Sequence, residues 1–93
     1  MPVVSGKLIR ERELEMTLAE LAKGESRTVL SVRGESLVTR RLMEMGVIPG
    51  VAVRMVKSAP FGDPLEINVR GYSLALRRNE AESVELEQVA TNE

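Results

Sequence analysis

The side chains of this 93-residue chain that could do chemistry are carboxylates, guanidinium groups and three lysine amines, because the sequence contains no His and no Cys. Nucleophilic catalysis of the Ser–His or Cys–His kind needs an imidazole or a thiol and is therefore excluded. Lys7, Lys23 and Lys57 remain as candidate bases, yet nothing near them indicates the apolar burial that would activate an amine. Asp63, the sole Asp, lies between a Gly and a Pro, where Asp commonly bonds its own turn backbone. We therefore expect that the protein is not an enzyme.

Metal binding would have to depend on oxygen ligands, since tight transition-metal sites use imidazole and thiolate. Residues 10–15 read RERELE, so arginines interleave with the three carboxylates and would repel a cation. The Met residues of the central segment fall at positions typical of a core. We expect neither a tightly held metal ion nor a cofactor.

Signals for phosphate or nucleic-acid binding are weak. The segment Gly46–Gly50 is flanked by glycines, but it follows a predicted helix and precedes a predicted strand, the reverse of a nucleotide-binding loop. The net charge of −1 does not favour wholesale contact with a phosphate backbone. The pairs Arg40–Arg41 and Arg77–Arg78 could contact an anion locally or be solvated surface charges. Phe61 and Tyr72, the only aromatic residues, lie well apart in the sequence, which makes a weak case for base stacking.

A capping-box pattern and glycine positions predict where the helices begin and end. Thr17 and Glu20 have the spacing of a capping box at the start of a short helix over residues 18–22, which Gly24 should stop. One further helical turn is predicted over residues 80–83.

The longest helix is predicted over residues 35–45. Its apolar stripe consists of Val38, Leu42 and Met45, and Leu37 is expected to widen that stripe. Gly46, followed by an apolar residue and a nearby Pro, is predicted to cap the helix.

Alternating apolar residues predict short strands between turn signals, over residues 27–32, 51–55, 65–69, 72–76 and 84–86. The strand over 65–69 has the cleanest alternation, and Tyr72 is expected on the inner face of the next strand together with Leu74 and Leu76. Residues 58–64 form a loop that contains two prolines and one Gly. Backbone geometry, and not binding, is assigned to the turn residues Gly46, Pro49, Gly50, Gly62, Pro64 and Gly71.

These elements predict a mainly β fold, a small partly open barrel of about five strands with added helices. Its core must be aliphatic, with Met filling gaps. We expect a lead-in over residues 1–16, a barrel domain over 17–87 and a frayed tail over 88–93. No signal-peptide stretch and no apolar run of about 20 residues is present, so we expect a cytoplasmic chain without membrane insertion.

The strings RRLMEMGVIPG, at residues 40–50, and SAPFGDPLEINVRGYSLALRRNEAESVEL, at residues 58–86, resemble the FeoA family of bacterial ferrous iron uptake. The resemblance covers about residues 17–86 and depends on the order and close spacing of several short motifs. It implies an SH3-like barrel, the family-level label of transition metal ion binding, and an accessory role toward FeoB, a membrane iron transporter with a GTP-hydrolysing cytosolic domain. The same domain is similar to the C-terminal module of iron-responsive repressors.

The leading hypothesis is a partner-binding module that regulates or assembles the transporter. The residues predicted to touch that partner are ones the core does not need: Arg40, Arg41, Met43 and Glu44 on the helix, and Phe61 and Asp63 on the loop. Phe61 could be a plug over the barrel end or an exposed anchor. The alternative function is a small nucleic-acid-binding barrel or an iron-responsive transcription regulator module. An exposed strand edge could also pair with a second copy of the chain.

Overall fold

A computed structural model describes residues 3–4, 7–8, 16–34 and 36–90, and it carries described side chains for residues 16–34 and 36–88. Most of the predicted lead-in over residues 1–16 lies outside the described residues. The described parts of the lead-in are two short strands, β1 (Val3–Val4) and β2 (Lys7–Leu8), which pair antiparallel. The last three residues of the predicted tail, 91–93, also lie outside the described part.

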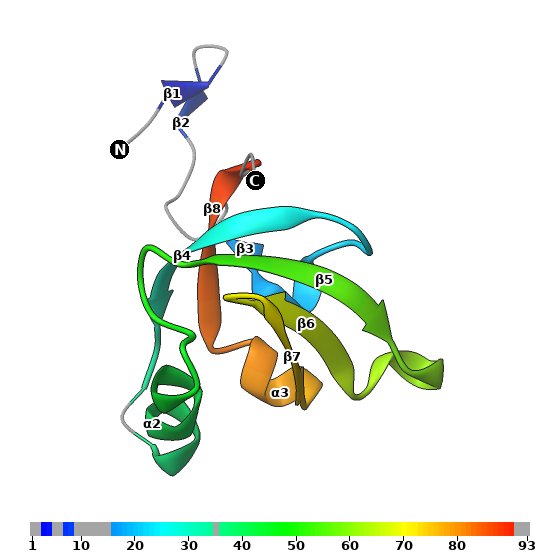
Figure 1. Ribbon diagram of the computed structural model, residues 1–93. Coiled ribbons are helices and arrows are strands. Elements are labelled where there is room, and N and C mark those ends of the chain that lie inside the picture. The colour runs from blue at the N-terminus through cyan, green and yellow to red at the C-terminus, as the bar shows by residue number, and fades with distance from the viewer. Residues whose placement is uncertain (1–2, 5–6, 9–15, 35, 91–93) are drawn as a thin grey trace.

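The compact part is one antiparallel sheet of six strands that curls around a core (Figure 1). The strand order is β3-β8-β4-β5-β6-β7, and the bounds are β3 Met16–Thr17, β4 Ser26–Val32, β5 Ala52–Ser58, β6 Leu65–Val69, β7 Tyr72–Leu76 and β8 Val84–Ala90. The predicted barrel with added helices is thus confirmed. The final strand is longer than predicted, because it continues to Ala90, which pairs with Arg27 of β4.

The core of the sheet is aliphatic, as predicted. Leu65, Ile67 and Val69 alternate along β6 and are 1% exposed or less. Phe61 and Tyr72 are exposed, so Val, Leu and Ile fill the interior together with Met55. Tyr72 pairs with buried Val69 and so shares the face of Leu74 and Leu76, as predicted, but its side chain is 44% exposed and does not join the core. It lies at the end of β7 next to the turn, and its hydroxyl lies beside Gly46.

Two of the predicted helices are shorter or shifted. The first is a 3₁₀ helix, η1 (Leu18–Glu20), because Leu21 turns into extended backbone and is buried in the core. The Thr17 amide donates to Glu20 Oε1 at 2.8 Å, which confirms that half of the predicted capping box. The last helix, α3 (Arg78–Ala81), begins two residues before the predicted turn, because the Glu80 carboxylate accepts the Arg77 amide at 2.8 Å and holds its first turn.

The central helix, α2 (Leu37–Glu44), begins after Ser36, whose hydroxyl accepts the Thr39 amide at 3.3 Å. Leu42 is fully buried, as its stripe predicts, and the stripe's other members are partly buried against the core. Leu37 is 81% exposed, so the prediction that it widens this stripe is wrong. Thr39 occupies the other flank instead, where its hydroxyl donates to the Arg33 carbonyl at 2.9 Å.

The C-terminus of α2 is a Schellman motif centred on Gly46, which has φ +98. The Gly46 amide donates to the Met43 carbonyl at 3.1 Å, and the Val47 amide donates to the Leu42 carbonyl at 3.0 Å. Val47 is fully buried, so this cap also directs the chain back into the core.

We expect that Gly46→Ala lowers the free energy of unfolding by about 1 kcal/mol, because a side chain at positive φ is strained. A Cβ at this position would also lie 3.1 Å from the Tyr72 hydroxyl oxygen. Gly50→Ala is the matched control, because Gly50 has φ +93 but a Cβ added there would meet nothing within 4 Å. Urea unfolding of both variants separates the cost of backbone strain from the cost of the contact with Tyr72. A smaller loss of unfolding free energy for Gly46→Ala than for Gly50→Ala would contradict that contact.

The hairpin between β6 and β7 has a two-residue turn, Arg70–Gly71, with φ +52 and +85. Positive φ at both positions is the signature of a type I′ turn, which matches the twist of the strands it joins. The positive φ expected at Gly71 is thus observed, and Gly46, Gly50 and Gly62 also have positive φ. Pro64 follows a cis peptide bond after Asp63.

A candidate protein-binding face

Three of the predicted interface residues lie on one side of α2. Arg40, Met43 and Glu44 have helical spacing i, i+3 and i+4 and are all exposed. They line a groove of about 570 Å³ whose other walls are Gly34, Ser36, Thr39 and Ile48. A cationic, an anionic and an apolar side chain thus line one open groove. Such a lining suits contact with the surface of another protein better than binding of a small reactive substrate.

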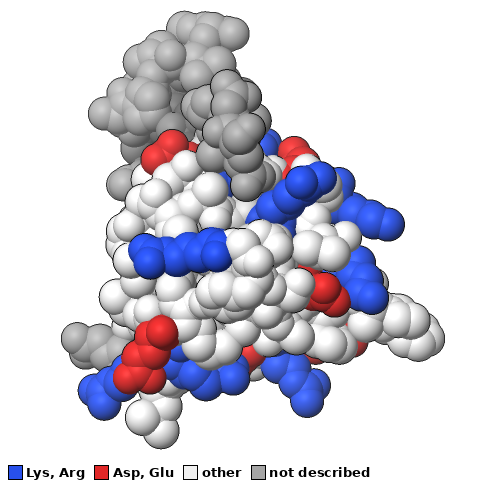
Figure 2. Space-filling view, viewed as in Figure 1, with Lys and Arg blue, Asp and Glu red and all other residues white. Residues whose placement is uncertain are grey.

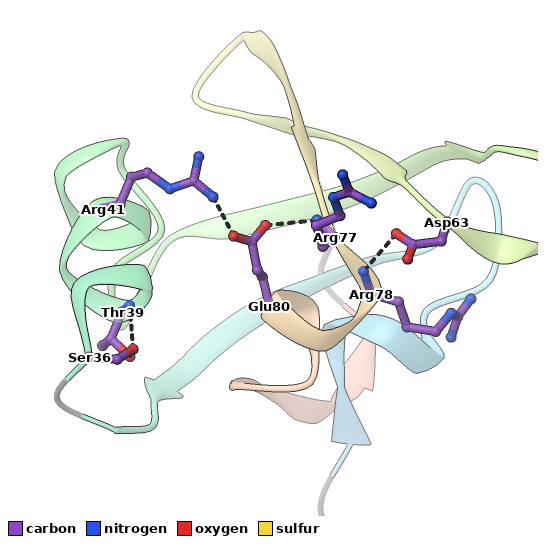
Figure 3. A network of polar contacts seen from close by, with 7 residues as sticks. All are labelled: Ser36, Thr39, Arg41, Asp63, Arg77, Arg78 and Glu80. Atoms are coloured by element: carbon purple, nitrogen blue, oxygen red, sulfur yellow. Dashed lines mark hydrogen bonds and ion pairs between the residues drawn. The ribbon is translucent and has the colours of Figure 1, made fainter.

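Arg41 lies on the other side of α2, where its guanidinium already has an ion-pair partner. Its Nη2 forms an ion pair with Glu80 Oε2 of α3, while Glu80 Oε1 accepts the Arg77 amide (Figure 3). The Glu80 side chain is only 11% exposed. Both oxygens of one carboxylate therefore join α2 to the N-terminus of α3.

Asp63 and Arg78 connect α3 to the loop after β5. The Arg78 amide donates to Asp63 Oδ1 at 3.0 Å, so Asp63 caps α3, whereas the sequence predicts that it bonds its own turn. The Arg78 guanidinium donates from Nε to the Gly62 carbonyl at 2.9 Å and from Nη1 to the Ala19 carbonyl at 3.0 Å. One arginine thus ties the loop, α3 and η1 together.

Phe61 stands at the tip of that loop, inside the 3₁₀ turn η2 (Pro60–Gly62), and is 106% exposed. The alternative in which it plugs the barrel end is excluded, because a plug would be buried. Its φ of +68 lies in the left-handed region, where a bulky residue is uncommon. An exposed, strained aromatic residue on a tethered loop has the geometry of an anchor for a partner pocket.

A second groove lies on the Arg41 side of α2. It measures about 280 Å³ and is lined by Arg41, Pro64, Ala75, Leu76, Arg77 and Glu80. The walls of this groove come from α2, β7, α3 and the loop. We call this side of the molecule the α2–η2 face. It comprises Arg40, Met43 and Glu44 on α2, the groove, and Phe61 in η2. Figure 1 shows α2 and η2 at opposite ends of this side, with β7 and α3 between them.

Charges of both signs lie on the α2–η2 face. Figure 2 shows basic and acidic side chains interleaved along the lower edge of the molecule. Among the described residues, no group of three or more acidic side chains could hold a metal ion. No helix of the described part is long and apolar enough to cross a bilayer. The face can bind through ion pairs, backbone groups and an apolar anchor.

A curled six-stranded antiparallel sheet with short helices defines a small SH3-like domain. The chain matches the FeoA domain over residues 16–88, and it belongs to the FeoA family. The family resemblance and the SH3-like fold read from the sequence are confirmed.

A curated relative and two solved structures also support membership of the FeoA family. A fusion of Fe(2+) transport protein A with Fe(2+) transporter FeoB from Porphyromonas gingivalis is 32% identical over 77 residues, which are 83% of this chain. This chain spans only 9% of the length of that fusion protein. FeoA of Chlorobium tepidum is 42% identical with a TM-score of 0.75, covering 84% of this chain and 74% of that one.

Stenotrophomonas maltophilia FeoA complexed with zinc is 39% identical with a TM-score of 0.70, covering 77% of this chain and 89% of that one. That protein is described as an SH3 domain protein proposed to act as a ferrous iron transport activating factor. Manganese-dependent transcriptional repressors share the fold at 13% and 15% identity. The chain is therefore part of a family associated with ferrous iron transport.

The sequence did not point to Glu80, Arg78 or Thr39 as organising residues. Glu80 stands three residues after Arg77, which is the capping spacing, but the cap position holds an Arg instead of Ser, Thr, Asp or Asn, so the start of a helix is not marked. The contacts of Arg78 reach residues 16 and 59 positions away, and no sequence pattern predicts them.

Proposed function

We propose that this chain is a non-enzymatic, cytosolic accessory protein of bacterial ferrous iron uptake that binds an FeoB-type membrane transporter through a protein–protein interface. The observation that carries the proposal is the Porphyromonas relative, in which transport protein A and transporter FeoB form one polypeptide. Fusion holds two domains at a high effective concentration, which favours a contact between them. Regulation or assembly of the transporter follows from such a contact.

The interface we propose is the α2–η2 face. Arg40, Met43 and Glu44 contribute free side chains on α2, and Phe61 contributes an exposed anchor. Arg41 and Asp63, which are also proposed interface residues, stabilise the face through Glu80 and Arg78 as well as contacting the partner. Aromatic and Arg side chains are the types that most often carry binding energy at interfaces.

The test measures binding of the purified chain to the cytosolic region of an FeoB-type transporter by calorimetry. Arg40→Glu and Phe61→Ala are each expected to weaken binding about tenfold or more, since loss of an anchor typically costs more than about 1 kcal/mol. Arg54→Glu is the matched control, because Arg54 is exposed on β5 and lines neither groove of the face. Wild-type affinity in both face variants would refute this interface, and no binding by the wild-type chain would refute the proposed function.

A further inference from the structure

Among the described strands, β7 forms one end of the sheet and pairs only with β6. Its two-residue turn makes Val69 and Tyr72 the closing pair, and in such a hairpin the closing pair is hydrogen-bonded. The pairs Ile67–Leu74 and Leu65–Leu76 are then hydrogen-bonded as well, because the two kinds of pair alternate. The amide and carbonyl groups of Ser73 and Ala75 therefore point away from β6.

Nothing in the described part of the chain satisfies those outward groups. No described backbone or side-chain group hydrogen-bonds to the amide or carbonyl of Ser73 or Ala75 from the open side. Strand β7 also lacks the usual protection of an edge, since it contains no Lys, no Pro and no irregular register with β6. The other end of the sheet, β3, is only two residues long. The open edge of β7 can thus receive an added strand.

The charge beside this edge is locally positive. The groove that includes Ala75 contains Arg41, Arg77 and Glu80, and the Glu80 oxygens are occupied by Arg41 and by the Arg77 amide. The Arg77 guanidinium forms no ion pair with any residue the structure describes. Glu66, which lies opposite Ala75 on β6, pairs with Lys57 at 3.8 Å. One unpaired cation therefore remains next to the edge.

We propose that the edge of β7 binds an extended, acidic peptide segment of a partner by strand addition, with Ser73 and Ala75 supplying the backbone hydrogen bonds and Arg77 selecting a carboxylate. A second copy of this chain fits less well, because its β7 strand contains no carboxylate that could pair with Arg77. The inference rests on the proposed function only for the identity of the protein that supplies the segment.

The test uses the ¹⁵N-labelled full chain and two synthetic heptapeptides, one alternating Thr with Glu and one alternating Thr with Lys. The acidic peptide is expected to shift the amide signals of Ser73 and Ala75, to slow their hydrogen exchange, and to bind about fivefold or more tightly than the basic peptide. Equal binding of the two peptides, binding of neither, or shifts confined to other strands would overturn the proposal.

Ala75→Pro removes an outward amide without breaking the β6–β7 ladder and is expected to weaken peptide binding about tenfold or more. Ala75→Thr keeps that amide and is the matched control. Arg77→Glu leaves the backbone intact and is expected to reverse the preference between the two peptides, which keeps the test decisive if the Pro variant does not fold. Wild-type binding by folded Ala75→Pro, or an unchanged preference in Arg77→Glu, would refute strand addition.

Three further outcomes separate the hypotheses. If Ser73 and Ala75 become protected as the concentration of the chain alone rises, a second copy occupies the edge and the acidic peptide is the wrong occupant. If Ala75→Pro binds the cytosolic region of the transporter as tightly as the wild type, the edge inference fails while the proposed function stands. If the acidic peptide binds at β7 but the transporter region does not bind, the proposed function fails while the edge inference stands.

Discussion

The variant Leu42→Ala is expected to lose about 3 kcal/mol of unfolding free energy, the typical loss for a buried Leu that leaves a cavity. Leu42 is fully buried and is the deepest contact of α2 with the core, while the helix has only eight residues. Since proteins typically have a free energy of unfolding of about 5–15 kcal/mol, this loss removes a substantial share of the stability. The midpoint of urea unfolding, followed by circular dichroism, is therefore expected to shift to a clearly lower urea concentration.

Leu37→Ala is the matched control for that experiment. Leu37 lies on the same helix but is 81% exposed, so its truncation is expected to change the free energy of unfolding by less than about 0.5 kcal/mol. Equal losses in the two variants would show that α2 packs through the wider stripe that the sequence predicted, and not through Leu42 alone.

The variant Glu80→Ala is expected to lose about 2 kcal/mol, because one nearly buried carboxylate makes two contacts. It accepts the Arg77 amide at the start of α3, a cap typically contributing about 1 kcal/mol, and it pairs with Arg41 of α2. Its loss leaves both donors without their partner. Urea unfolding measures the loss, and amide hydrogen exchange across α2 should become faster because the link between the helices is gone.

Glu82→Ala is the appropriate comparison for Glu80→Ala, because Glu82 is exposed and makes no ion pair with a described residue. It removes the same charge two residues further on, so any general effect of net charge appears in both variants. A Glu80→Ala protein as stable as Glu82→Ala would mean that the link between α2 and α3 does not stabilise the fold.

The strands over residues 65–69 and 72–76 could be predicted because burial alternates along β6 and along the second half of β7. Leu65, Ile67 and Val69 are all buried where the alternation places them, and Gly71 occupies the turn that needs positive φ. Helix ends were predicted less well. Leu21 ends η1 early because the core, and not a glycine, decides where that segment turns.

The candidate site was only partly predictable. Interface candidates such as Arg40 and Phe61 could be selected from the sequence as side chains that the core does not need, and both are exposed. The sequence could not distinguish them from Arg41 and Asp63, which are also surface residues but form hydrogen bonds or ion pairs within the chain. Which surface charge has an internal partner depends on how separate elements are placed.

What the residues alone determined is local: alternating aliphatic side chains and glycine turns define a small β domain, and the lack of His and Cys excludes catalysis of the Ser–His or Cys–His kind. Only the tertiary structure decided that Arg41 meets Glu80, 39 positions away, that Asp63 caps α3, 15 positions away, and that β7 ends the sheet with an open edge. The reason is physical. Turn and strand preferences are short-range properties of each residue, whereas ion pairs and free edges arise only once packing has brought distant segments together.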